Sequence, residues 1–297
     1  MSQIFDALHQ SATERGNGAR EFSAAKELLQ VVERRNASAT ALADEPEVTP
    51  TTGEASLQFP AVKVELPQYS RFACFGKTDT LAAEKFRFLA TRLRHLQQKR
   101  SIKRLVVTSS VVGEGKSMVA ANLACALAMG KQQVLLIEGD LRRPSLGKEL
   151  GLQELPGLSQ MLQGEGDGGN NIYRLEGAGL CVLLAGDAHS SPLEFMDAGK
   201  LSIVLDRICA GFDWVVIDSP PVLPLADTSI WMRLSDAILM VTRPGVTSKK
   251  QLQRSLDAIE QAKLLGSVLN ASSETTSNHY YYHYTSRTGA SQSVDSK

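Results

Sequence analysis

The sequence predicts an α/β fold, a three-layer sandwich in which helices cover both faces of a mostly parallel sheet. Short runs rich in Val, Leu and Ile recur from residue 104 onward, and stretches with helical spacing separate most of them. These runs are apolar throughout rather than at every second residue, so both faces of the sheet must be covered. The alternation of strands and helices then implies right-handed crossovers between parallel strands. We expect strands at 104–109, 133–138, 180–184, 214–218, 237–242 and 266–270, and helices at 81–96, 116–130, 199–210, 226–235 and 248–264.

Length and composition allow one domain of ordinary size with tails. Of the 297 residues 43% are apolar, and 32 Lys and Arg balance 32 Asp and Glu, so the overall charge gives no reason to expect nucleic acid as a partner. The four cysteines are scattered, without the spacing of metal ligands, which is typical of reduced thiols. The longest apolar stretch, 118–129, is too short to span a bilayer. We therefore expect a cytoplasmic chain.

Four regions follow one another along the chain. Residues 1–35 contain two short amphipathic patterns that predict docking helices. Residues 36–75 are rich in Ala, Thr, Pro and Glu without periodicity, which is typical of a linker. Residues 76–270 hold the alternating strands and helices and form the predicted domain. Residues 271–297 are too poor in aliphatic side chains to build a core, and we expect a disordered tail.

A glycine-rich turn, SSVVGEGKS, follows the first predicted strand and precedes a predicted helix. This is the context of a P-loop, in which backbone N–H groups and the start of the helix bind phosphate oxygens. Gly113 and Gly115 let the backbone curl, Lys116 would reach the β- and γ-phosphates, and the Ser117 hydroxyl would bind Mg²⁺. Ser110 stands where the strict pattern has glycine. We expect the nucleotide to contact Val112, Gly113, Glu114, Gly115, Lys116, Ser117 and Met118.

Two further strands end on acidic residues. The run VLLIEGD places Glu138 and Asp140 at the end of one strand, and WVVID places Asp218 at the end of another. A single Asp at such a position is more often a cap or turn residue. Together with a P-loop, however, the two strand ends predict carboxylates at the edge of the sheet where a nucleotide-bound Mg²⁺ needs them. Asp218 is then the Walker B residue, Asp140 and Glu138 form a second acidic pair that faces the γ-phosphate, and Ser117, Asp218 and Asp140 are candidate metal ligands.

At this point the sequence resembles the bacterial tyrosine autokinases of capsule and exopolysaccharide synthesis, the BY-kinases. The similarity runs from about residue 76 to 284. It includes EKFRFLATRL, SSVVGEGKS, IEGDLRRP, PGLSQMLQG, FDWVVIDSPPVLPLADTS, VTRPGVTS and GSVLN, in this order. The family shares the deviant Walker fold of the MinD and ParA ATPases, but those proteins carry a signature lysine where this chain has Val111. The resemblance therefore favours the kinase branch.

The resemblance implies an ATP- and Mg²⁺-dependent protein-tyrosine kinase. Lys116, Asp140, Glu138 and Asp218 would be its catalytic residues. The opening MSQIFDAL is similar to members whose membrane adaptor, a polysaccharide co-polymerase, is a separate chain. The expected partners are that adaptor, a cognate tyrosine phosphatase and further copies of the chain. The expected location is the cytoplasm, at the inner face of the plasma membrane.

The stretch HYYYHY near the end holds four of the six tyrosines: Tyr280, Tyr281, Tyr282 and Tyr284. Composition alone favours an aromatic patch that docks on a partner or on the domain. Beside a kinase-like domain, the cluster instead predicts phosphoacceptors, and an extended chain from Asn270 to Tyr280 spans at most ~33 to 36 Å, enough to reach a neighbouring protomer.

Four positions depart from the family pattern. Glu138 stands in place of the usual Asp, and an error of ~1 Å in a catalytic group can cost on the order of 10²-fold in rate. Val112 and Met118 replace the common Pro and Thr of the P-loop, and Ala90 replaces the last Arg of a helix motif that joins protomers in a ring. Two other functions therefore stay open. One is a MinD- or ParA-like regulatory ATPase, and the other is a degenerate, nucleotide-binding scaffold of the export machinery.

Overall fold

The computed structural model describes residues 59–64, 66, 72–73, 80–164, 171–187, 198–223 and 227–272. The predicted docking helices within residues 1–35, most of the predicted linker and the tyrosine cluster lie outside these residues.

A mostly parallel sheet forms the centre of the described domain, as the alternating pattern predicts. Only β4 and β5 pair antiparallel among the strands that the structure describes, and the other neighbours are parallel. In sheet order the strands are β1 (Ala61–Val62), β4 (Tyr173–Leu175), β5 (Leu180–Leu183), β3 (Val134–Glu138), β6 (Trp214–Asp218), β2 (Arg104–Ser109), β7 (Ala237–Thr242) and β8 (Leu264–Leu269).

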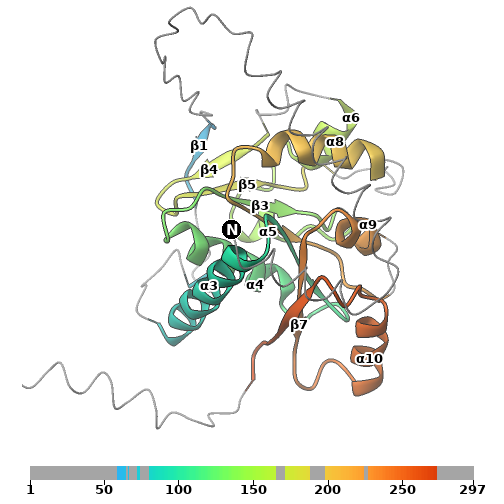
Figure 1. Cartoon of the computed structure of the whole chain (residues 1–297). Coiled ribbons are helices and arrows are strands. Elements are labelled where there is room, and N and C mark those ends of the chain that lie inside the picture. The colour runs from blue at the N-terminus through green and yellow to red at the C-terminus, as the bar shows by residue number, and fades with distance from the viewer. Residues whose placement is uncertain are drawn as a thin grey trace, which may run out of the picture. The chain divides into compact units, whose positions relative to one another are not determined.

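Helices cover both faces of this sheet, which confirms the three-layer sandwich (Figure 1). One buried cluster joins α3 (Leu81–Lys99), α4 (Lys116–Ala128) and α5 (Leu146–Glu149) to one face. A second cluster joins four helices to the other face. These are α6 (Leu158–Gln163), α8 (Ala198–Cys209), α9 (Asp227–Arg233) and α10 (Lys249–Asp257). None of the described helices has the length and hydropathy that a membrane crossing requires.

Several short elements escape the sequence patterns. The strands β1 and β4 and the helices α5 and α6 are too short to show a period, and α10 ends at Asp257 rather than at residue 264. Strand β1 falls in the stretch predicted as a linker. There Phe59 stacks on Phe212 with ring centroids 5.6 Å apart, and Phe72 is buried. The described domain therefore includes part of the predicted linker, because a few apolar side chains of that stretch pack against the domain.

Helix α3 is capped at its N-terminus by Thr80, whose side chain accepts a hydrogen bond from the N–H of Ala83 at 3.2 Å. Its outer surface carries an ion pair between Glu84 and Arg87 at 2.5 Å. Ala90, by contrast, is fully buried in the core. An arginine at position 90 would therefore bring a guanidinium group into the core, and Ala90→Arg would destabilise the domain.

Candidate functional site

The predicted site elements meet at one edge of the sheet. Strands β3, β6 and β2 are adjacent, and Asp218 is the register partner of both Glu138 and Val107. The P-loop follows β2, so its lysine reaches the same edge as the acidic ends of the other two strands. Ligands of open α/β sheets bind at the carboxyl ends of the strands. The structure thus confirms that the P-loop and both acidic strand ends lie together.

The P-loop has the backbone that its glycines predict. Gly113 and Gly115 have φ of 89° and 87°, in the left-handed region, and α4 begins directly afterwards at Lys116. A Cβ at Gly113 would meet nothing within 4 Å, so the space above this glycine is open. Such a turn can receive an anion at the start of the helix.

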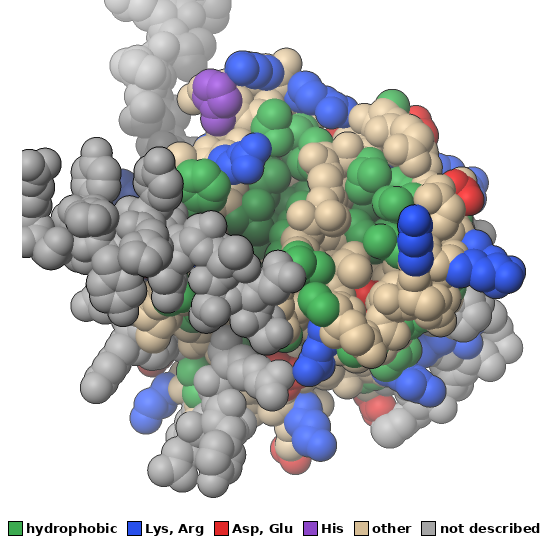
Figure 2. Space-filling view, turned by 90° about the horizontal axis from the view of Figure 1, so that it is seen from below, with side chains coloured by type: hydrophobic (Ala, Val, Ile, Leu, Met, Phe, Trp, Pro, Cys, Tyr) green, Lys and Arg blue, Asp and Glu red, His purple; other side chains and the backbone are tan. Residues whose placement is uncertain are grey.

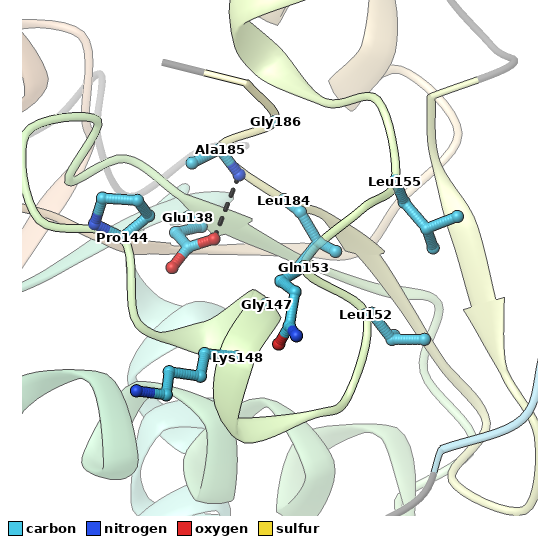
Figure 3. A pocket seen from close by; sticks show the side chains of 10 residues that line it. All are labelled: Glu138, Pro144, Gly147, Lys148, Leu152, Gln153, Leu155, Leu184, Ala185 and Gly186. Atoms are coloured by element: carbon cyan, nitrogen blue, oxygen red, sulfur yellow. Dashed lines mark hydrogen bonds between the residues drawn. The ribbon is translucent and has the colours of Figure 1, made fainter. Parts of the chain in front are cut away.

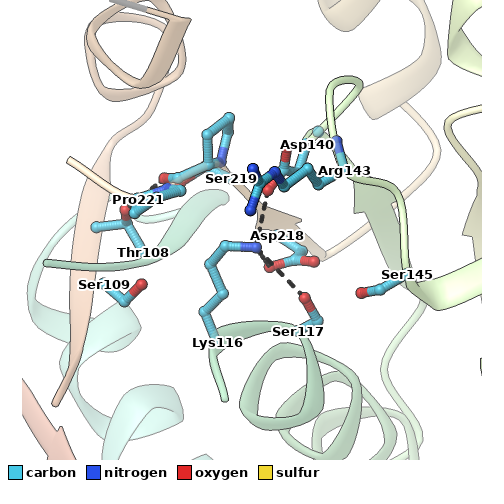
Figure 4. Close-up of polar contacts among 12 residues, drawn as sticks. Thr108, Ser109, Lys116, Ser117, Asp140, Arg143, Ser145, Asp218, Ser219 and Pro221 are labelled. Atoms are coloured by element: carbon cyan, nitrogen blue, oxygen red, sulfur yellow. Dashed lines mark hydrogen bonds and ion pairs between the residues drawn. The ribbon is translucent and has the colours of Figure 1, made fainter. Parts of the chain in front are cut away.

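Lys116 lies between two carboxylates at this edge (Figure 4). Its Nζ is 3.0 Å from Oδ2 of Asp140 and 3.7 Å from Oδ1 of Asp218, and it also donates to the Ser117 hydroxyl at 3.5 Å. Burial lowers the pKa of Lys116, but the charges of Asp218 and Asp140 outweigh burial, and the net pKa is raised. The lysine therefore stays a cation, which suits a group that must face phosphate oxygens.

Asp218 is a buried carboxylate that faces Lys116 across 3.7 Å. It is 1% exposed, and neither of its side-chain oxygens has a hydrogen-bond partner within the part of the chain that the structure describes. Burial raises its pKa to about 7, although Lys116 favours the charged form. Buried carboxylate oxygens without hydrogen bonds are costly unless enough positive charge lies beside them, and Asp218 shares the single charge of Lys116 with Asp140. Asp218, with the Ser117 hydroxyl nearby, therefore fits the protein's share of a Mg²⁺ site.

The other ligands of such an ion would come from phosphates and water. Among the described residues, no group of three or more His, Cys, Asp or Glu side chains could hold a metal. Mg²⁺ commonly binds to one or two carboxylates together with substrate phosphates, rather than to an all-protein cage. The donor set at this edge therefore suits a metal that arrives with a nucleotide.

The raised pKa of Asp218 predicts an unusual pH dependence of stability. Without nucleotide, the folded chain keeps this proton up to about pH 7, whereas the unfolded chain loses it near pH 4. The folded state thus binds more protons in this range, so its stability falls as the pH rises from about 4 to about 7. We expect Asp218→Asn to raise the Tm of the nucleotide-free chain at pH 8 by about 2–8 °C and to abolish the further rise caused by MgATP.

Thermal melts at pH 5 and pH 8, with and without MgATP, check this expectation. Parent and variant should melt closer together at pH 5, where Asp218 of the folded parent is protonated. A lower Tm of the variant at pH 8 would show that the pairing of Asp218 with Lys116 stabilises the nucleotide-free fold more than burial of the carboxylate destabilises it, and would contradict this expectation.

Glu138, predicted to face the γ-phosphate beside Asp140, is instead engaged with the backbone (Figure 3). Its Oε1 accepts from the N–H groups of Ser145 and Leu146 at 2.5 and 2.6 Å, and its Oε2 accepts from Ala185 at 3.0 Å. Burial raises the pKa of Glu138, while these hydrogen bonds favour its charged form. The Glu138 side chain, longer than the Asp usual in the family, thus links the start of α5 to the segment just after β5. In this structure its carboxylate therefore stabilises the fold.

A cavity of about 80 Å³ lies beside Glu138. Pockets for small-molecule ligands are typically ~300–1,000 Å³, so this cavity cannot enclose a nucleotide. Its walls are Glu138, Pro144, Gly147, Lys148, Leu152, Gln153, Leu155, Leu184, Ala185 and Gly186 (Figure 3).

We expect Glu138→Asp to destabilise the fold rather than to repair a defect. The shorter side chain would move the carboxylate away from the three backbone N–H groups, and leaving buried donors unpaired costs about 1–3 kcal/mol each. Thermal melts of the nucleotide-free chain should show a Tm lower by at least ~2–4 °C. If Glu138→Asp left the Tm unchanged and made phosphoryl transfer faster, the result would contradict this structural role and support the catalytic role predicted from the sequence.

Glu114 has a role that the P-loop pattern does not predict. Its side chain is fully buried and accepts hydrogen bonds from the N–H of Val111 at 2.8 Å, from the N–H of Arg243 at 3.1 Å and from the Thr247 hydroxyl. Its carbonyl accepts from Asn270 Nδ2 at 2.8 Å. The side chain therefore braces the loop, and only the backbone of Glu114 is left for a nucleotide. An acidic residue between two loop glycines was the available signal, but two of its three side-chain partners, Arg243 and Thr247, lie 129 and 133 residues away in the sequence.

Other predicted contact positions differ in exposure. Val112 is 54% exposed, Ser117 is buried and Met118 is partly buried. The phosphoacceptor candidates Tyr280, Tyr281, Tyr282 and Tyr284 lie outside the described residues.

Comparison with known proteins identifies relatives that match about two thirds of the chain. A family model described as ParA, NUBPL iron-transfer P-loop NTPase, matches residues 101–296. The tyrosine-protein kinase YwqD of Bacillus subtilis is 30% identical over 208 residues, which cover 69% of this chain and 88% of that protein. The tyrosine-protein kinase ptk of Acinetobacter johnsonii is 33% identical over 196 residues, 65% of this chain but only 27% of the relative.

A solved structure agrees with these relatives. The kinase domain of Escherichia coli tyrosine kinase ETK is 28% identical and superposes with a TM-score of 0.63, over 67% of this chain and 79% of that one.

Proposed function

Because the chain belongs to the ParA-type P-loop NTPases and, among them, to the bacterial tyrosine-protein kinases, we propose that it transfers the γ-phosphoryl group of ATP to its own C-terminal tyrosines. The observation that carries this proposal is the position of Lys116 between Asp140 and Asp218 at the edge of the sheet where the P-loop lies. The tyrosine cluster lies in the sequence that follows the last strand, β8.

The P-loop would hold the triphosphate. Its curled backbone and the start of α4 offer N–H groups, and Lys116 would turn from the carboxylates toward the β- and γ-phosphates. Ser117 and Asp218 would hold Mg²⁺, with Asp140 next to them. Mg²⁺, when bound, neutralises negative charge on the transferring phosphoryl group.

Asp140 is our choice for the group that receives the tyrosine proton. The phenolic hydroxyl, with a pKa of about 10, attacks the γ-phosphorus as its proton passes to a carboxylate. A phosphotyrosine forms, the bond to the leaving ADP oxygen breaks, and ADP carries away the electron pair. Asp140 contacts Lys116 directly at 3.0 Å and is 4% exposed. It would therefore lie beside phosphates that Lys116 binds. Glu138 would support this site through the backbone contacts described above.

Transfer between protomers agrees with the length of the tail. Ten residues separate Asn270, which contacts the P-loop, from Tyr280, and an extended chain of this length spans at most ~33 to 36 Å. Each phosphate adds a charge of roughly −1.5 to −2. A phosphorylated tail should therefore leave an acidic site by repulsion and loosen an assembly of several copies.

We further propose a membrane adaptor on a separate chain, a cognate phosphatase and recruitment to the inner face of the plasma membrane. The ptk kinase is much longer than the segment that matches this chain, whereas YwqD is nearly covered. Regulation of exopolysaccharide or capsule export would follow from such an adaptor.

Seen from below, hydrophobic side chains gather on one face of the domain beside Lys and Arg (Figure 2). Phe88 of α3 and Leu269 of β8 are each 59% exposed, which suits contacts with other proteins.

A complementation experiment tests the kinase reaction and whether the phosphoryl group passes from one protomer to the tail of another. One chain carries Lys116→Met and an intact tail, and the other carries Tyr→Phe at positions 280, 281, 282 and 284 with an intact P-loop. Each alone should form little phosphotyrosine with MgATP, whereas their mixture should label the tail of the first chain.

The outcomes separate the competing functions. Phosphotyrosine in the parent but not in the mixture would exclude transfer between protomers. ATP hydrolysis without phosphotyrosine in the parent would indicate a MinD- or ParA-like regulatory ATPase, and nucleotide binding without turnover would indicate a scaffold.

A further inference from the structure

Helix α9 is joined to the loop after β3 by an ion pair. Asp227, the first residue of α9, is 1% exposed, and its two carboxylate oxygens accept hydrogen bonds from Arg142. Nε of Arg142 is 2.5 Å from Oδ2, and a second guanidinium nitrogen is 3.4 Å from Oδ1. Such two-point pairs fix direction as well as distance. The pair therefore orients the loop two residues beyond Asp140.

A second contact joins α9 to the same loop on the other side of Asp140. The indole N–H of Trp231 donates to the carbonyl of Gly139 at 3.1 Å, in a fully buried position. The ring lies so close that a Cβ at Gly139 would be 2.8 Å from it. The N–H of Gly139 donates in turn to the carbonyl of Asp218 at 2.8 Å. Gly139 is thus held between α9 and the end of β6.

The same helix also holds the segment after β6. The Thr228 hydroxyl lies 3.0 Å from the carbonyl of Pro220 and 2.9 Å from that of Pro221. These prolines follow Asp218 by two and three residues. One short helix therefore contacts the segments that follow both acidic strand ends.

We propose that α9 is a clamp that fixes the carboxylate of Asp140 relative to Asp218 and Lys116, with Asp227 and Trp231 as positioning residues. This inference rests on the proposed kinase function. Gly139 directly precedes Asp140, and Arg142 follows it by two residues, so any shift of the loop moves the carboxylate that receives the proton. A displacement of ~1 Å in such a group can cost on the order of 10²-fold in rate.

Two conservative variants loosen the clamp while the P-loop stays intact. Arg142→Lys keeps a positive charge but cannot form the two-point pair with Asp227. Trp231→Phe keeps an aromatic ring but removes the N–H that binds Gly139. We expect each variant to lower kcat for phosphotyrosine formation by ~10-fold or more, with the Kd of MgATP changed less than about threefold. Asp206→Asn is the control, since it breaks a 2.6 Å ion pair with Arg104 at the opposite end of β2 and should leave kcat unchanged.

Tryptophan fluorescence gives a readout that does not require phosphoryl transfer. The chain has two tryptophans, so Trp231 is the only one in a Trp214→Phe variant. Its indole bonds to the carbonyl beside Asp140, and we expect a non-hydrolysable MgATP analogue to shift its emission. In the same background, Lys116→Met should remove the shift.

The results distinguish the clamp from the proposed function. A parent chain that forms no phosphotyrosine contradicts the kinase function, and the clamp is then judged by the fluorescence shift alone. An active parent whose Arg142→Lys and Trp231→Phe variants keep the parental kcat contradicts the clamp, even if their Tm falls. Emission that does not respond to the nucleotide analogue contradicts it as well.

Discussion

Replacing Lys116 with methionine should lower phosphotyrosine formation by at least ~10²-fold, because it removes the cation that lies between Asp140 and Asp218. Methionine is similar in length but carries no charge, so the phosphates would face two carboxylates without compensation. The domain should still fold, since Lys116 is the first residue of α4 and its side chain belongs to neither hydrophobic cluster. The measurement is the initial rate of phosphotyrosine formation with MgATP.

Lys250→Met is the matched control. Lys250 is exposed on α10, and the same substitution there should leave the rate within about twofold of the parent. Equal rates for Lys116→Met and the parent would remove Lys116 from the mechanism.

Changing Tyr280, Tyr281, Tyr282 and Tyr284 together to phenylalanine should remove nearly all phosphotyrosine and leave MgATP binding unchanged. The four side chains follow one another in a segment beyond the last strand, so no single Tyr→Phe change should lower the total label by more than about half, because the neighbours can replace it. The measurements are total phosphotyrosine after complete reaction and the Kd of MgATP for each variant.

A variant that tests specificity is available within the fold. Tyr173 is buried in β4, so Tyr173→Phe should leave the label unchanged. Label that survives in the fourfold variant would mean that the tail acts as a docking element and that the acceptor lies elsewhere.

The main architecture could be predicted because its signals are local. Strands β2, β3 and β6 are continuous apolar runs. Asp218 lies at the end of one such run and Asp140 just after another. Because these strands are parallel neighbours, their ends meet at one edge of the sheet. Lys116 and Ser117 are similarly fixed by their place after the two loop glycines. In these cases a residue's neighbours in the sequence determine its place in the fold.

The direction of the individual side chains could not be predicted. Glu138 ends β3 just as Asp218 ends β6, yet its carboxylate accepts hydrogen bonds from N–H groups of α5 and of the segment just after β5. Glu114 lies between glycines but turns inward to the loop after β7. Their partners belong to distant or very short segments, and no period in the sequence reports on such contacts. The hydrogen bond from Trp231 to the carbonyl of Gly139 could not be predicted either, because the two residues are far apart in the sequence.

The central claim is that this chain phosphorylates its own tail, and mapping the phosphate on the purified parent tests it most directly. The chain is incubated with MgATP, with Lys116→Met treated in parallel, and the modified residues are located by mass spectrometry. The account predicts phosphotyrosine within residues 280–284 of the parent, none on Tyr173, and almost none anywhere in the Lys116→Met chain. Absence of phosphotyrosine from residues 280–284 while MgATP is bound and consumed would contradict it.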